Sequence, residues 1–301
     1  MITYKGTHSD LKCRGFQYET GKTFKHSGEI TLCRSGFHSC RFPVDCLLYY
    51  RDPTDRYFKV EASGNIGENT INEDSKIVSS KIRFIKEVTI VDLIKISIHN
   101  FGKYKKDKYV NISSFYVPKK NFETTSHVDI ECLLNDKHSI YVIASFINRI
   151  YNIGRNCLFK ADFQSIYSIG DNNYFQQTSK RCSPYVYIKG NRNVLSTPTR
   201  YAKRKDFNSE LFTKVYVVGN MNVISIVYQR GYIDGDNNII NILDSAYVDF
   251  SDKSECNSIV IKEYTPTLIV DSKHPVEIRT ERRKIVTQGY QVFYNLIPEL
   301  I

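Results

Sequence analysis

A short repeat in the second half of the chain constrains the fold more than any other feature. Each repeat has apolar residues followed by Gly-x-x-Asn and a further apolar residue. The clear repeats have Gly170, Gly190, Gly219 and Gly235, and degenerate copies begin at Gly154 and Ser254. One repeat is too short to bury its own apolar face, whereas stacked repeats bury a continuous core. The pattern therefore predicts a β-solenoid of parallel strands, similar to a β-helix, with coils from about residue 125 to about residue 275.

The corners of this solenoid depend on the glycine and the asparagine of each repeat. Both residue types tolerate the left-handed backbone that tight corners require, and asparagines on successive coils stack as a hydrogen-bonded ladder. We therefore expect equivalent corner positions for Asn173, Asn193, Asn222 and Asn238. The alternative is an antiparallel sandwich with hairpins of the Asn-Gly type.

Residues 1–104 have a different pattern, which predicts an α+β domain. Alternating strand segments surround two helical segments. One of these begins at Pro43, and the other begins at Thr89, which has Asp92 three residues later as a capping partner. A lysine-rich run then marks a break, so we expect residues 105–124 to form a linker or a first coil. Residues 125–301 complete the chain as an all-β solenoid with a C-terminal cap.

The net charge of +10 favours acidic partners such as nucleic acid, nucleotides or acidic proteins, although a lysine-rich soluble surface gives the same number. The chain has no stretch of 18 apolar residues and no apolar segment at its start, so we expect neither a membrane span nor a secretory signal. Its eight cysteines are then reduced thiols, and the host cytoplasm is the expected location.

Positive charge is concentrated in residues 180–205, which contain eight basic residues and no acidic one. We interpret this segment as an insertion that projects from the solenoid, with Tyr185, Tyr187 and Tyr201 among its basic residues. Basic groups and aromatic rings together suit phosphate contact and base stacking, while a solvated loop is the alternative. The predicted nucleic-acid- or anion-binding residues are Arg192, Arg200, Lys203, Arg204 and Lys205.

Cysteine chemistry gives no comparable signal. Cys33, His38, Cys40 and Cys46 lie close together, but their spacing is not that of paired zinc ligands. We expect these cysteines to be unbridged and metal-free. Cysteine–histidine catalysis is not fixed by any spacing, and the chain has no P-loop, nucleophile elbow or zinc-protease motif.

Four motifs stand in a fixed order in the first hundred residues, at residues 11–24, 32–50, 56–64 and 74–84. They resemble an uncharacterised domain family found in phages and prophages, and the resemblance covers about residues 2–100. Members often carry repetitive, turn-rich C-terminal regions, which agrees with the repeats here. The resemblance implies a phage or prophage setting and no established activity.

A second resemblance involves a tyrosine, a basic residue and a glycine at residues 4–6, Gly-Phe-His before a helix, and a late glutamate. This order is similar to ADP-ribosyltransferase-like domains. It implies an NAD-binding cleft in which Lys5 and His38 hold ribose or phosphate and Glu87 orients the acceptor. Lys5 stands where that family has arginine or histidine, and a Ser-Thr-Ser run is missing. The adjoining candidates for ligand binding are Tyr4, Arg14 and Phe37.

Two functions follow from these observations. The first is a phage- or prophage-encoded binding protein, in which the N-terminal domain takes a ligand or host factor and the solenoid offers an interaction surface. The partner is then a host protein or nucleic acid, and an oligomer forms through the solenoid or the tail. The alternative is an ADP-ribosyltransferase-like or other nucleotide-processing enzyme with NAD as its cofactor. The enzyme requires Lys5, His38 and Glu87 to line one cleft.

Overall fold

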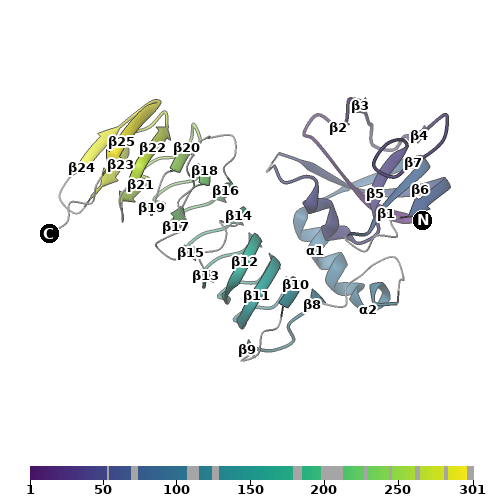
Figure 1. Cartoon of the computed structure of the whole chain (residues 1–301), viewed down its shortest axis with the longest axis horizontal. Helices are drawn as coiled ribbons and strands as arrows, with labels where there is room; N and C mark the ends of the chain where they lie inside the picture. Colours follow the sequence, from purple (N-terminus) through teal and green to yellow (C-terminus); the bar gives the residue numbers. More distant parts are fainter. Residues whose placement is uncertain are drawn as a thin grey trace. The chain divides into compact units, whose positions relative to one another are not determined.

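The computed structural model describes residues 1–52, 54–68, 74–106, 115–123, 129–178, 185–197, 213–226, 229–243, 246–261, 265–280 and 284–296. The chain divides into two compact units, Met1–Phe115 and Tyr116–Ile301 (Figure 1). We call them the first unit and the solenoid unit.

The first unit is built on an antiparallel sheet of five strands in the order β4-β7-β5-β1-β6. Because β6 pairs with both β1 and β7, the strands β1, β5, β7 and β6 form a closed ring. A two-stranded hairpin of β2 and β3 lies outside this sheet. The strands are β1 (Ile2–Thr7), β2 (Lys12–Cys13), β3 (Phe16–Gln17), β4 (Thr23–Lys25), β5 (Phe37–Cys40), β6 (Arg56–Glu68) and β7 (Lys76–Val88).

Helices are few in the described part of this unit, so it is mostly β rather than evenly α+β. The segment that begins at Pro43 is a short 3₁₀ helix, η1 (Pro43–Leu48), and not an α-helix. The predicted start at Thr89 is confirmed, because Thr89 and Asp92 form a reciprocal capping box at the start of α1 (Ile90–His99). The four-residue α2 (Phe101–Tyr104) follows.

The solenoid unit consists of successive parallel strands, which confirms the predicted solenoid and shows that the antiparallel sandwich is wrong (Figure 1). The strands form two parallel ladders, because β12 pairs with both β13 and β14, and each strand from β13 to β21 pairs with the second strand after it. At the end of the described part of this unit, β24 and β25 pair antiparallel with β23 and β22. The first strands are β8 (Phe115–Tyr116), β9 (Phe122–Glu123), β10 (Asp129–Asn135), β11 (Tyr141–Asn152), β12 (Leu158–Ile169), β13 (Tyr174–Gln177), β14 (Tyr185–Lys189), β15 (Val194–Ser196) and β16 (Thr213–Val218). The later strands are β17 (Val223–Ile226), β18 (Gln229–Asp234), β19 (Ile239–Ile242), β20 (Ala246–Phe250), β21 (Ser258–Ile261), β22 (Thr265–Asp271), β23 (Val276–Arg279), β24 (Lys284–Thr287) and β25 (Gln291–Leu296).

The glycine of each repeat is required by close stacking of the coils. A Cβ atom on Gly219 would collide with the carbonyl oxygen of Gly190, and one on Gly235 would collide with that of Gly219. These glycines also have positive φ values, for example 128° at Gly219. The left-handed residue of the turn is not the asparagine itself but the residue before it, such as Met221 with φ of 56°. The expectation that the asparagine adopts this conformation is therefore wrong.

The asparagine instead forms the predicted ladder, and the equivalence of the corner positions is confirmed. The backbone N–H of Asn173 donates to Oδ1 of Asn193 at 3.0 Å, and that of Asn193 donates to Oδ1 of Asn222 at 2.8 Å. The ladder continues from Asn222 to Asn238 at 2.9 Å and from Asn238 to Asn257 at 2.8 Å. All these side chains are buried, so each one supplies the acceptor that a buried backbone N–H of the neighbouring coil requires.

We predict that Asn222→Ala destabilises the solenoid unit by about 2–4 kcal/mol, because it removes three buried hydrogen bonds and leaves the N–H of Asn193 without this acceptor. Asn220→Ala is the matched control, since Asn220 lies in the same turn with an exposed side chain. We expect Asn220→Ala to cost less than about 1 kcal/mol, because water replaces the lost bond. Denaturant unfolding of both variants measures the difference, and equal destabilisation would contradict the ladder.

Candidate functional site

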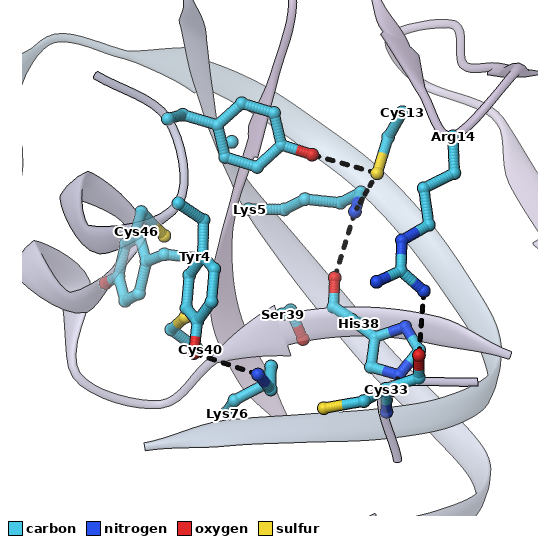
Figure 2. Close-up of a pocket in the computed structure, with 13 residues that line it drawn as sticks. Tyr4, Lys5, Cys13, Arg14, Cys33, His38, Ser39, Cys40, Cys46 and Lys76 are labelled. Carbon is cyan, nitrogen blue, oxygen red and sulfur yellow. Dashed lines mark hydrogen bonds between the residues drawn. The ribbon is translucent and has the colours of Figure 1, made fainter. Parts of the chain in front are cut away.

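A pocket in the first unit is lined by 13 residues from β1, β2, β5, η1, the start of β7 and the adjoining turns (Figure 2). Its volume is about 120 Å³, close to that of a cavity which holds one six-membered ring. Four lining residues are basic or imidazole side chains, four are cysteines and three are tyrosines, and none is a carboxylate. The lining residues are Lys5, Arg14, His38 and Lys76, then Cys13, Cys33, Cys40 and Cys46, then Tyr4, Tyr49 and Tyr50, and finally Gly6 and Ser39.

Lys5 is the buried cation of the pocket. It lies on β1 with 4% of its surface exposed, and its Nζ donates to the carbonyl oxygen of His38 at 3.0 Å (Figure 2). Nζ also lies 3.7 Å from Sγ of Cys13 and 5.1 Å from the centre of the Tyr18 ring. Burial lowers the pKa of Lys5, while the nearby cysteines oppose this effect. The amine is therefore desolvated but placed to meet a negative group.

Gly6 explains why a glycine follows Tyr4 and Lys5 in the sequence. A Cβ atom at this position would collide with the ring of Tyr50, so only glycine lets that ring pack against β1. Tyr50 comes directly after η1 and the residue Tyr49, and its hydroxyl reaches across to Sγ of Cys13 at 2.8 Å. The glycine therefore positions a donor at the pocket.

His38 is a neutral acceptor and not a cation. Its Nε2 accepts a hydrogen bond from the backbone N–H of Cys33 at 2.8 Å, which leaves the proton on Nδ1. Burial, with the charges of Lys5, Arg14 and Lys76, lowers the pKa of His38 to about 4. At neutral pH the imidazole cannot hold a phosphate by charge, which differs from the role implied by the transferase resemblance.

Arg14 provides a second cation at the pocket. It lies in the turn between β2 and β3 with a left-handed backbone, φ of 50°. Its Nη1 donates to the carbonyl oxygen of Cys33 at 2.8 Å, which holds the guanidinium beside the pocket (Figure 2). The other N–H groups of this planar fork suit a carboxylate or phosphate.

The sulfur atoms of the pocket fall into two kinds. Cys40 and Cys46 are buried, and the hydrogen bond between them, together with burial, raises the pKa of Cys40 well above its usual value. Cys13 is half-buried and meets two donors, the hydroxyl of Tyr50 and the amine of Lys5. The sequence offered Cys13 only as one of three possible partners of a histidine, and neither Cys13 nor Tyr50 was predicted as a site residue. Gly6 was the one sequence feature that pointed to a large side chain such as Tyr50 packed against β1. The residues beside Cys13 in the sequence do not indicate that it contacts Lys5 and Tyr50.

Four of the six candidates predicted in this unit line the pocket, namely Tyr4, Lys5, Arg14 and His38. Phe37 does not, because its ring is buried in the aromatic core with Tyr18 and Phe84, so its prediction as a ligand-binding residue is wrong. Glu87 also lies elsewhere.

The expectation that Lys5, His38 and Glu87 line one cleft is wrong. Glu87 pairs with Arg56 through two bonds, Nε to Oε1 at 2.8 Å and Nη2 to Oε2 at 2.6 Å. It lies near the end of β7 opposite Phe58, whereas His38 pairs with Val78 near the start of that long strand. Glu87 is thus distant from His38 along β7, is separated from Lys5 by Phe58 of β6, and is occupied by an ion pair outside the pocket lining.

The basic segment of the solenoid unit differs from the predicted single insertion. Tyr185 and Tyr187 are buried on β14, and residues 185–197 form β14, β15 and the turn between them. Arg192 is exposed in that turn. Arg200, Lys203, Arg204 and Lys205 lie outside the described residues, so their contact with nucleic acid stays a prediction.

Among the residues that the structure describes, no group of three His, Cys, Asp or Glu side chains could hold a metal ion, and Cys33, Cys40 and Cys46 have free thiols. The metal-free state of these cysteines stays a prediction. No helix in the described part of the chain is long and apolar enough to cross a membrane.

Residues 1–96 match the family model named Domain of unknown function (DUF7666). This range includes every residue that lines the pocket, and it supports the predicted resemblance of the first unit to an uncharacterised domain family. Neither the curated proteins nor the solved structures gave a match.

We predict that His38 makes the first unit less stable in mild acid. The ordinary histidine pKa of 6.5 falls to about 4 on folding, so between these values the unfolded chain binds a proton that the folded chain does not. Stability must therefore fall as the pH is lowered through that window. His38→Gln keeps an acceptor for the N–H of Cys33 but cannot titrate.

Thermal melting of full-length protein at pH 7 and pH 5 measures this effect. We expect the melting temperature of the first unit to drop less in His38→Gln than in the unmodified chain. His99→Gln changes an exposed histidine at the end of α1 and should keep the full drop. An identical drop in the His38→Gln variant would show that another group is responsible.

Proposed function

We propose that this chain is a binding protein whose first unit takes a small anionic ligand in the pocket around Lys5. The observation that carries this proposal is the lining, which contains Lys5, Arg14 and Lys76 and no carboxylate. A pocket with this balance attracts negative groups and repels cations.

The charge of Lys5 makes a bound anion favourable. Neither Lys5 nor Arg14 has an ion pair with a carboxylate among the described residues, whereas Lys76 lies 3.9 Å from Asp74. A buried ammonium without a counterion carries a desolvation cost that a nearby negative group offsets. An anion bound at Lys5 and Arg14 therefore lowers the free energy more than the same anion bound at a solvent-exposed lysine patch.

The size of the pocket limits what enters it. A volume of about 120 Å³ accommodates one small group, such as a phosphate, a carboxylate or a single ring, and not a whole dinucleotide. Arginine binds phosphate and carboxylate through paired hydrogen bonds, and the tyrosines add flat apolar walls. The ligand class that fits is a small phosphorylated or carboxylated molecule, or the charged end of a larger one such as NAD.

The biological setting is part of the same proposal. The four ordered motifs, which resemble a family found in phages and prophages, favour a phage- or prophage-encoded protein that acts in the host cytoplasm. The match to a domain of unknown function supports the uncharacterised domain family alone. The solenoid unit would then provide a stiff, extended surface for a host protein or nucleic acid. The ADP-ribosyltransferase alternative is weaker, because Glu87 lies away from the pocket and pairs with Arg56.

We predict that phosphorylated small molecules raise the melting temperature of the protein while their uncharged counterparts do not. Suitable pairs are ribose 5-phosphate with ribose, and AMP or NAD with adenosine. Arg14→Gln should weaken binding about tenfold or more, because it removes a charge-assisted hydrogen bond. Affinity should also fall as salt concentration rises.

Calorimetric titration of the best ligand tests the proposal. Arg34→Gln is the matched control, because it removes the same charge from an exposed residue next to Cys33 that does not line the pocket. It should leave the affinity nearly unchanged. No stabilisation by any anion, or equal weakening by both variants, would contradict a specific anion pocket.

A further inference from the structure

Cys13 holds a position that distinguishes it from the other described cysteines. Its Sγ lies in the pocket wall, where the Tyr50 hydroxyl donates to it at 2.8 Å and Nζ of Lys5 lies 3.7 Å away (Figure 2). Two donors directed at one sulfur make Cys13 a hydrogen-bond acceptor within reach of a basic amine. A neighbouring lysine and partial exposure are the environment of reactive cysteines.

The remaining pocket cysteines lack this combination. Cys40 and Cys46 are buried, and Cys40 has a raised pKa, which keeps its thiol protonated. Cys33 is exposed, and its backbone groups rather than its sulfur contact His38 and Arg14. Cys256 is exposed in a turn of the solenoid unit and provides an internal reference for an ordinary accessible thiol.

We propose that Cys13 is a nucleophile that adds to a small carbonyl compound bearing a carboxylate or phosphate. This inference rests on the proposed anion pocket and extends it from binding to reversible covalent capture. The guanidinium of Arg14 holds the charged group of the compound beside the pocket. The adjacent residue Cys13 then faces the carbonyl carbon.

The chemical step needs only groups that the pocket contains. The Cys13 sulfur forms a bond with the carbonyl carbon as the π bond of the carbonyl breaks. The Lys5 ammonium gives a proton to the carbonyl oxygen, which becomes a hydroxyl group. The Lys5 amine then takes up the proton that the Cys13 thiol loses, since the two groups lie 3.7 Å apart. The product is a hemithioacetal, and the reverse proton transfer releases the compound. No electron is gained or lost, so the step requires no oxidant or reductant.

Competitive alkylation of the full-length chain tests this proposal. Anionic iodoacetate and neutral iodoacetamide are compared at equal concentration, and peptide mass spectrometry gives the rate at each cysteine. We expect Cys13 to react several-fold faster than Cys256 with both reagents, and to prefer iodoacetate several-fold more than Cys256 does. Arg14→Gln should remove that preference without slowing iodoacetamide.

A second variant and a protection assay distinguish the reactivity of Cys13 from the binding of an anion in the pocket. Tyr50→Phe keeps the ring that packs against Gly6 and removes the donor to Cys13, so we expect alkylation of Cys13 at pH 7 to slow several-fold. Glyoxylate, a small anionic aldehyde, should protect Cys13 from iodoacetamide. Acetate has the charge without the aldehyde, and acetaldehyde has the aldehyde without the charge, so both should protect much less.

Each contrary outcome overturns a different part of the inference. If Cys13 reacts no faster than Cys256 with either reagent, it is not a nucleophile, although anion binding in the titration above would still stand. If Cys13 is fast but shows no preference for iodoacetate, the anionic substrate class is wrong and the anion pocket fails with it. Equal protection by acetate and glyoxylate would show binding without carbonyl addition.

Discussion

The amine of Lys5 is buried inside the first unit. It donates to the carbonyl oxygen of His38 and to Sγ of Cys13, and it has no carboxylate partner among the described residues. The arrangement around it follows from this burial. The ring of Tyr50 packs over Gly6, and its hydroxyl reaches Cys13. Burial and the positive charges lower the pKa of His38, so that it acts as a neutral acceptor. An anion that enters the pocket compensates the buried charge of Lys5, so these residues suit ligand binding as well as packing.

The solenoid was predictable from the sequence because its constraints are local and repeat along the chain. Each glycine faces a carbonyl oxygen of the preceding coil, and each corner asparagine supplies one acceptor to a neighbouring N–H. Glycine therefore meets the need for close approach of the coils, and asparagine meets the need for a hydrogen-bond acceptor. The spacing of these two residues along the sequence marks the turns of the solenoid. Tyr187 shows the limit, because an aromatic residue beside basic residues gives the same pattern in a projecting loop and in a buried strand.

The pocket was predicted only in part, because long-range strand pairing creates it. Tyr4 pairs with Cys40 and His38 pairs with Val78, and no local pattern indicates these registers. Lys5 and His38 were found through their order in a motif. The same reasoning wrongly included Glu87, since order along the chain does not give the position along a strand of 13 residues. Cys13 was not predicted as a site residue, because its partners, Lys5 and Tyr50, come from separate segments.

The two units are organised in different ways. The first unit gathers basic, thiol and phenol groups around one small volume, while the solenoid unit repeats one turn along its length. The central claim is that an anion occupies the pocket beside Lys5 and Arg14. Anomalous diffraction from crystals of the full chain soaked in iodide tests it most directly. The account predicts an iodide peak in contact with both the Lys5 amine and the Arg14 guanidinium. Iodide bound only at surface lysines, with none in the pocket, would contradict it.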